Sequence, residues 1–130
     1  MDDLYRDFIL EHYKRPRNFG ELEPHDLEAH EYNPLCGDEI GVQIKVADGK
    51  IADLRFNGHG CAISQAAASI ATEELIGMDV EEAGKLDADW MLELLGIDIS
   101  ATRRKCALLL LKALRHAITG DGSWPVGATD

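Results

Sequence analysis

Two segments of alternating polarity, separated by Asp48-Gly49, constrain the fold of this 130-residue chain more than any other feature. Residues 40–46 alternate apolar and polar side chains, which is the period of a strand with one buried face. An Asp-Gly pair suits a two-residue hairpin turn, because both central positions of that turn need a positive φ. Residues 51–57 then return as the second strand. We therefore expect an antiparallel hairpin, and residues 29–33 are a candidate for a third, short strand.

The rest of the chain favours helices. They are predicted over residues 2–14, 61–76, 79–84, 87–95 and 102–118. Pro16 ends the first helix, Gly77 suits the C-terminal end of the second, and Asp79 and Asp87 are candidate N-caps. One side of the first helix is predicted to carry its apolar residues and a histidine: Leu4, Tyr5, Phe8, Ile9, His12 and Tyr13. Strands followed by helices, without a linker, predict one α+β domain over residues 1–130.

The charge of the chain disfavours two classes of function. Twenty-four acidic residues against thirteen Lys and Arg leave a net charge of −11. Such a charge repels nucleic-acid phosphates and anionic lipid, so we expect neither nucleic acid nor a membrane as a partner. No apolar run approaches the ~20 residues that a membrane-spanning helix needs, and the N-terminus resembles no leader sequence. We expect a soluble, cytoplasmic protein.

Three cysteines, Cys36, Cys61 and Cys106, are the candidate chemical groups. An odd number cannot all pair with one another, and their wide spacing differs from that of a secreted disulfide-rich domain. In a reducing cytosol the three thiols are buried filler, reactive nucleophiles or metal ligands. Their sequence neighbours have to distinguish these alternatives.

The first cysteine lies in the segment Asn33-Pro34-Leu35-Cys36-Gly37-Asp38, a predicted loop between two strands. Pro34 and Gly37 shape this loop, so the thiol of Cys36 and the carboxylate of Asp38 can point to one centre. Taken alone, a Cys-Gly-Asp tripeptide is a weak signal, and an incidental loop cysteine is the alternative interpretation.

The second and third cysteines lie at predicted helix starts. Cys61 follows Gly58-His59-Gly60, and a helix N-terminus stabilises a thiolate. The alternatives are that Cys61 only caps or packs and that His59 is merely solvated. Cys106 follows Arg103-Arg104-Lys105, where positive charge is unfavourable unless an anionic group, such as a thiolate–metal site or an acidic partner, lies near. A solvated basic turn with a buried cysteine is the alternative there.

Taken together, the three thiols and Asp38 predict a metal site. Three thiolates and one carboxylate can complete a four-coordinate Zn²⁺ site or hold the irons of a small iron–sulfur cluster. Thiolates are too soft to suit magnesium or calcium. Permanent structural zinc sites more typically use Cys-x-x-Cys pairs, which this chain lacks. Ligands scattered singly over three loops indicate a site that can exchange what it holds.

Over nearly its whole length the sequence resembles the iron–sulfur cluster scaffold family, which comprises IscU, the N-terminal domain of NifU, and SufU. The motifs that carry the resemblance run in order along the chain: residues 4–10, residues 12–20 (His-Tyr-Lys-Arg-Pro-Arg-Asn-Phe-Gly), residues 33–38, the Cys61 helix with Thr72-Glu73, and the Cys106 helix. Three spaced cysteine motifs in this order are far more specific than any one of them.

The resemblance implies the fold, the site and the partners. The fold is a small three-stranded antiparallel sheet packed by an N-terminal helix and C-terminal helices, with the site at one exposed end (the SufE/NifU-like fold). Cys36, Asp38, Cys61 and Cys106 are implied as ligands of Zn²⁺ or of a transient [2Fe–2S] cluster. A cysteine desulfurase of the SufS or IscS type is implied as sulfur donor, and other iron–sulfur proteins as downstream acceptors.

Within the family, the residues around Cys61 and Cys106 are similar to the SufU pattern, Gly-x-Gly-Cys-x-Ile-Ser and Arg-x-Lys-Cys-Ala. IscU proteins usually carry His where this chain has Lys105, and a proline-containing chaperone-recognition stretch where this chain has residues 99–103. However, the chain has little room for the insertion of about twenty residues that SufU proteins carry before the third cysteine. Both a cluster scaffold and a zinc-dependent sulfurtransferase therefore stay open.

The resemblance to SufU makes Cys36 the sulfur acceptor, whereas the resemblance to IscU makes Cys106 its rival. Arg103 is an auxiliary candidate that could hydrogen-bond a thiolate or the partner. Two functions from other classes compete with the sulfur-accepting scaffold. One is a static zinc-binding interaction module without sulfur chemistry, and the other is a cysteine hydrolase with Cys61 as nucleophile and His59 as base.

Overall fold

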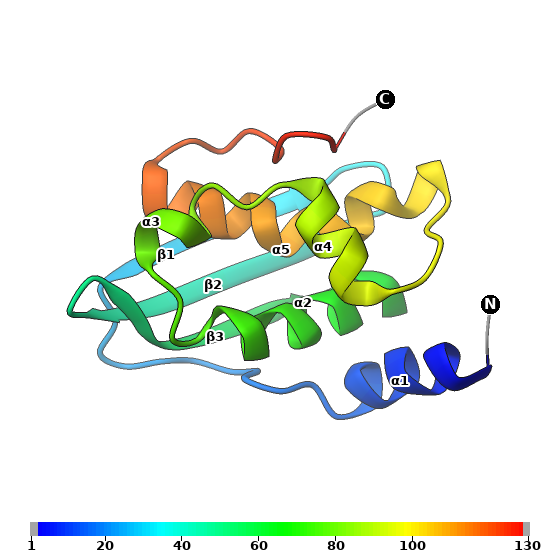
Figure 1. Cartoon of the computed structure of the whole chain (residues 1–130), viewed down its shortest axis with the longest axis horizontal. Coiled ribbons are helices and arrows are strands. Elements are labelled where there is room, and N and C mark those ends of the chain that lie inside the picture. The colour runs from blue at the N-terminus through cyan, green and yellow to red at the C-terminus, as the bar shows by residue number, and fades with distance from the viewer. Residues whose placement is uncertain (1–2, 129–130) are drawn as a thin grey trace.

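The structure is a computed structural model that describes residues 3–128. The elements follow one another as α1 (Asp3–Lys14), β1 (Leu27–Asn33), β2 (Asp38–Ala47), β3 (Lys50–His59), α2 (Ala62–Leu75), α3 (Val80–Ala83), α4 (Ala88–Leu95) and α5 (Ala101–Thr119) (Figure 1). One helix, three strands and four further helices confirm the predicted α+β class and the three-stranded antiparallel sheet.

The sheet is built around the predicted hairpin. Its strand order is β1-β2-β3, and both neighbouring pairs are antiparallel. Ala47 pairs with Lys50 across the turn, where Asp48 has φ 54° and Gly49 has φ 74°. These positive φ values are those that the two-residue turn requires. The candidate third strand is also present, and it begins two residues earlier than expected, at Leu27.

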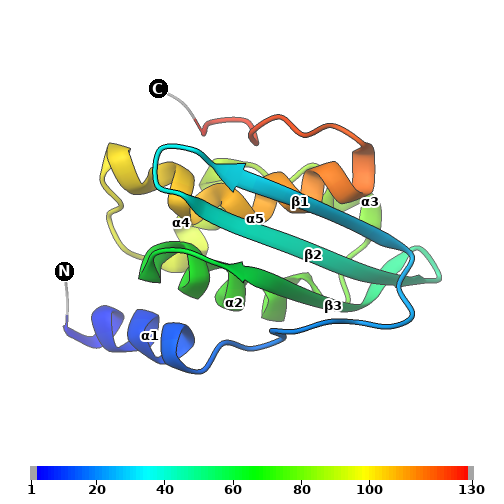
Figure 2. The same ribbon diagram turned by 180° about the vertical axis from the view of Figure 1, so that it is seen from behind.

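The two faces of the sheet differ in what covers them. Ile40, Val42 and Ile44 of β2 point into the core, where α2 and α5 pack across one face of the sheet (Figure 2). Glu39 and Lys45 alternate with them and point to the other face, which has a polar character. Apolar and polar side chains therefore alternate along β2 because one face of the sheet is buried in the core and the other faces solvent.

Helix α2 is buried on nearly all sides. Ala66, Ala67, Ala68 and Ser69 have no exposed surface, and these small side chains let α2 approach both α1 and α5 closely. Its C-cap is Ile76, and Gly77 follows with φ 98°, so the predicted helix end is displaced by one residue. This central position of α2 places its N-terminus at the end of the sheet, beside the β1–β2 loop, where the N–H of Cys61 donates to Asp38.

Helix α1 packs on α2 through fewer residues than its pattern predicts. Ile9 and His12 are buried, and His12 Nδ1 lies 2.7 Å from the hydroxyl of Ser69 on α2. Leu4, Phe8 and Tyr13 are exposed, because α1 lies at the side of the molecule and has α2 as its main neighbour (Figures 1 and 2). Asp2 and the side chain of Tyr5, which belong to the same prediction, lie outside the described residues.

The remaining helices connect α2 to α5. Asp87 is the predicted N-cap of α4 and accepts a hydrogen bond from the backbone N–H of Trp90 at 3.0 Å. Asp79 precedes α3 but caps nothing with its side chain, which instead forms an ion pair with Lys50 at 3.1 Å. Within residues 3–128, no helix combines the length and apolar character needed to cross a bilayer.

Candidate metal centre

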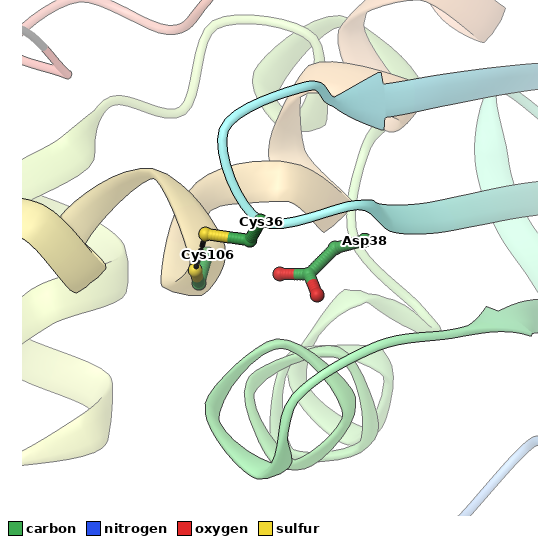
Figure 3. Close-up of side chains that lie close together, drawn as sticks. All are labelled: Cys36, Asp38 and Cys106. Atoms are coloured by element: carbon green, nitrogen blue, oxygen red, sulfur yellow. Dashed lines mark hydrogen bonds between the residues drawn. The ribbon is translucent and has the colours of Figure 1, made fainter.

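Three cysteines and an aspartate meet at one end of the sheet. Cys36 lies in the loop between β1 and β2, Asp38 begins β2, Cys61 is the N-cap of α2, and Cys106 is in the second turn of α5. Figure 3 shows the side chains of Cys36, Asp38 and Cys106 pointing toward one another from the loop, the strand and the helix. Segments that are distant in sequence thus supply the groups that the sequence predicted as one site.

Three of the four predicted ligands form a compact group. The ligand atoms of Cys36, Asp38 and Cys106 all lie within 4.8 Å of one another. The sulfurs of Cys36 and Cys106 are 3.0 Å apart, well beyond the bond length of about 2.05 Å in a disulfide, and both thiols are free. No other group of His, Cys, Asp and Glu within residues 3–128 comes this close together.

Cys61, the fourth predicted ligand, contacts the group through Asp38. Its backbone N–H donates to Asp38 Oδ1 at 3.0 Å, and its sulfur lies 3.7 Å from Asp38 Oδ2. The carboxylate of Asp38 therefore lies between the start of α2 and the two other cysteines. Cys61 belongs to the same cluster, although its sulfur is outside the compact group of three.

Asn33 is a site residue to which the sequence analysis assigned no role. Its side chain is buried, and its amide nitrogen donates to the sulfur of Cys36 at 3.5 Å and to that of Cys106 at 3.7 Å. Its backbone carbonyl accepts hydrogen bonds from the N–H groups of Cys36 and Gly37, which closes the loop. The sequence signal that could have identified Asn33 as a site residue is its position directly before the Pro-x-Cys-Gly-Asp segment.

Gly60 is needed where the end of β3 passes Asp38. A Cβ atom on Gly60 would overlap Asp38 Oδ1 and would lie 2.7 Å from the hydroxyl of Ser64. Ser64 is buried, and its hydroxyl donates to the carbonyl of Cys61 at 3.1 Å. The sequence predicted a tight turn at Gly58 and Gly60. The structure shows a second reason for glycine at position 60, which is the lack of space for a Cβ atom beside Asp38.

The donor atoms of this site are those of a zinc or iron site. Asp38 and Cys106 are each 1% exposed, so both are nearly removed from water. Burial raises the pKa of the Cys106 thiol far above its ordinary value, and the hydrogen bonds with Cys36 and Asp38 raise it further. A buried carboxylate beside three thiols is a donor set that fits zinc or iron and suits neither magnesium nor calcium.

Two of the basic residues before Cys106, Arg103 and Lys105, lie away from the thiols. Arg103 is exposed, and within the described residues no hydrogen bond joins its side chain to a thiol. The amine of Lys105 lies 5.1 Å from the ring centre of Trp124, and that of Lys112 lies 5.3 Å from the same ring. Lys105 therefore holds the C-terminal segment against α5, which explains both this cation and Trp124.

This position of Lys105 gives a prediction. Lys105→Met should lower the unfolding free energy by about 0.5–1 kcal/mol, the usual size of a cation–π contact at an exposed site, and leave the metal affinity unchanged. Urea denaturation and a zinc titration measure the two quantities. Lys85→Met, at an exposed lysine without a cation–π contact to Trp124, is the control and should change neither. A large loss of zinc affinity in Lys105→Met would place Lys105 in the metal site instead.

His59 does not support the hydrolase alternative. Its side chain is 75% exposed and its Nε2 lies 3.8 Å from the carboxylate of Glu39. Within residues 3–128 no hydrogen bond joins it to Cys61, which a general base for that nucleophile would need.

The chain matches known proteins over most of its length. The NifU-like N-terminal domain family matches residues 4–120. An iron–sulfur cluster assembly scaffold protein IscU of Archaeoglobus fulgidus is 39% identical over 115 residues, covering 88% of this chain and 74% of the relative. The zinc-dependent sulfurtransferase SufU of Bacillus subtilis is 36% identical over 138 residues, covering 93% of each chain. That alignment exceeds the 130 residues of this chain, so SufU contains residues without a counterpart here.

Solved structures agree with this relationship. A candidate iron–sulfur cluster scaffold protein SufU of Fervidobacterium islandicum superposes with a TM-score of 0.77 at 28% identity, covering 87% of this chain and 95% of that one. The N-terminal part of a NifU-like protein of Brucella abortus superposes with a TM-score of 0.73 at 25% identity, covering 90% and 93%. The family profile, the relatives and the shared fold place this chain in the NifU-like N-terminal domain family, together with the IscU and SufU proteins of iron–sulfur cluster assembly.

Proposed function

We propose that this chain is an iron–sulfur cluster assembly protein, a single domain over residues 1–130, that accepts sulfur from a cysteine desulfurase in the cytoplasm. Cys36, Asp38, Cys61 and Cys106 would hold either Zn²⁺ or the irons of a transient [2Fe–2S] cluster. The observation that carries this proposal is the convergence of three thiols and a buried carboxylate, from separate elements, at one end of the sheet. Other iron–sulfur proteins would then receive the cluster or the sulfur.

Cys36 is the sulfur acceptor in this proposal. It is the exposed member of the three cysteines, whereas Cys61 is partly buried and Cys106 is buried. The neighbouring Leu35 is 82% exposed, so the loop that carries Cys36 stands out from the surface. A partner enzyme has to bring its persulfide to the attacking sulfur, and Cys36 is the thiol that such a partner can reach. The burial of Cys106 argues against Cys106 as the sulfur acceptor.

The transfer step exchanges one sulfur–sulfur bond for another. The Cys36 thiolate attacks the outer sulfur of the desulfurase persulfide, a bond forms between these two sulfurs, and the desulfurase cysteine leaves as a thiolate. Cys36 then carries the persulfide, and no external oxidant or reductant is needed. A metal ion bound at the site supplies deprotonated thiols at neutral pH. Asn33 donates an N–H to the Cys36 sulfur, which helps to hold the nucleophile in place.

The relatives support both members of the family as models. SufU of Bacillus subtilis is named a zinc-dependent sulfurtransferase, and IscU of Archaeoglobus fulgidus an assembly scaffold. The sequence around Cys61 and Cys106 favours the SufU-like activity, with zinc bound in the resting protein. The alignment with IscU, in contrast, needs only 115 positions for 88% of this chain, whereas the alignment with SufU needs 138 positions for 93% and therefore contains gaps.

The test is an analysis of metal, sulfide and absorption on protein purified without oxygen and then mixed with a cysteine desulfurase, cysteine and iron. We expect one tightly bound zinc, no visible chromophore and faster desulfurase turnover. Labile sulfide with charge-transfer bands on the protein would instead indicate a cluster scaffold. In that case the same four residues would bind an iron–sulfur cluster in place of zinc. Zinc with neither response would contradict the proposal and leave a static zinc-binding module.

A further inference from the structure

The face of the sheet that points away from the core carries two histidines and a glutamate, residue types that often bind metals. Glu39 lies on the central strand β2, with His30 on β1 at one side and His59 on β3 at the other. Nδ1 of His30 lies 3.9 Å from one carboxylate oxygen of Glu39, and Nε2 of His59 lies 3.8 Å from the other. The thiol site described above uses none of these three residues.

The register of the strands explains this arrangement. His59 pairs directly with Glu39, whereas His30 pairs with Gly41 and reaches Glu39 diagonally. The imidazole of His30 lies directly over Gly41: a Cβ atom on residue 41 would be only 2.5 Å from the ring. A glycine at position 41 thus leaves the space through which His30 leans across β2 toward Glu39.

We propose that His30, Glu39 and His59 bind a divalent cation of borderline hardness, with ferrous iron as the cation of interest. Two imidazoles and one carboxylate form the ligand set that iron(II) uses in many proteins, and it leaves coordination positions open. The group is looser than the thiol site, because the two histidines lie on opposite sides of Glu39. To share one ion, both rings have to turn toward each other as well as toward the carboxylate. The side chains of His30 and His59 are 49% and 75% exposed, so both can turn inward, and the net charge of −11 attracts cations.

The proposed cation site lies at the same end of the sheet as the thiols. Asp38 and Glu39 are consecutive on β2, so their side chains leave opposite faces of the sheet. His59 is two residues from Cys61. Iron bound at Glu39 would therefore lie close to the thiol site, where Cys36 accepts sulfur in the proposed function. This role in supplying iron rests on the proposed function, whereas the binding of the cation does not.

The binding test is an NMR measurement of the histidine ring protons under anaerobic conditions. One equivalent of zinc first fills the thiol site, and protection of Cys36 from alkylation verifies that it does. Ferrous iron does not displace zinc from such ligands, because zinc binds more tightly in the general affinity order. We expect one equivalent of Fe²⁺ to broaden the signals of His30 and His59 by its paramagnetism.

The chain contains its own control for this measurement. His25 lies 3.4 Å from Glu23 and 3.3 Å from Glu28, so it has similar carboxylate neighbours outside the proposed site. Its signal should stay sharp. Unchanged signals of His30 and His59, or broadening of His25 in their place, would overturn the inference. If zinc failed to protect Cys36 from alkylation, that result would count against the proposed function and not against this site.

Variants separate iron binding from sulfur uptake. His30→Gln combined with His59→Gln, and Glu39→Gln alone, should each weaken Fe²⁺ binding to the zinc-loaded protein by about tenfold or more. Glu23→Gln makes the same charge change beside a histidine elsewhere and should leave the affinity unchanged. Persulfide formation on Cys36 should persist in all of these variants. Equal Fe²⁺ affinities in Glu39→Gln and Glu23→Gln would refute the proposal. They would show that His30, Glu39 and His59 form only ordinary surface ion pairs.

Discussion

Cys36→Ser is expected to abolish persulfide formation by a cysteine desulfurase while the protein stays folded. The substituted side chain is exposed, so the change of sulfur to oxygen should alter the unfolding free energy by no more than about 0.5 kcal/mol in the metal-free protein. A serine hydroxyl is not a nucleophile of comparable strength at neutral pH, and the other two thiols are less accessible. Mass spectrometry after incubation with desulfurase and cysteine measures the added sulfur, and urea denaturation measures the stability.

Cys61→Ser is the matched control for this prediction, because it also removes a predicted ligand but keeps the exposed thiol. It should still acquire sulfur, although with weaker metal binding. Two results would contradict the proposed role of Cys36. Sulfur uptake that survives in Cys36→Ser and disappears in Cys106→Ser would make Cys106 the acceptor. Unfolding of Cys36→Ser together with loss of zinc would favour the static zinc-binding module.

Gly60→Ala is expected to damage both stability and metal binding. The new methyl group would overlap Asp38 Oδ1, so the carboxylate has to move and its hydrogen bond with the N–H of Cys61 breaks. Asp38 is 1% exposed, and a buried polar group that loses its partner costs about 1–3 kcal/mol. We expect a loss of this size in urea denaturation. Zinc affinity should also fall by at least about tenfold, because the displaced carboxylate is a predicted ligand.

A double-mutant cycle with Asp38→Ala tests whether this contact is the cause. In the Asp38→Ala background the overlap with the carboxylate is absent, and the remaining neighbour is the rotatable hydroxyl of Ser64. Gly60→Ala should therefore cost much less there, with a coupling energy of about 1 kcal/mol or more between the two positions. Equal costs in both backgrounds would show that Gly60 is required by its own turn and not by Asp38.

The hairpin and the helices were predictable because their signals are local. Asp48-Gly49 determines the turn through the φ values of its two residues, and the alternation in β2 determines which side chains face the core. Asp87 caps α4 through a hydrogen bond to a residue three positions away. Predicted and observed ends differ by at most a few residues, because each end depends on a single turn of backbone.

The exposure of α1 and the position of Lys105 were not predictable in this way. The pattern of α1 places Phe8 and Tyr13 on its apolar side, but a helix at the side of the molecule buries only what its neighbour covers. The charge of Lys105 suggested a nearby anion, whereas the structure places it on the ring of Trp124, nineteen positions further along the chain. In both cases the deciding partner belongs to another element.

The class of the fold, the family and the candidate ligands were predictable from local signals: turn chemistry, periodicity and spaced cysteine motifs each involve neighbouring residues. How these groups meet became clear from the packed fold. It placed the sulfurs of Cys36 and Cys106 3.0 Å apart, put Asn33 beside both, and brought His30 and His59 to either side of Glu39. The physical reason is that such contacts depend on strand register and helix packing, which join residues with no local relationship in the chain.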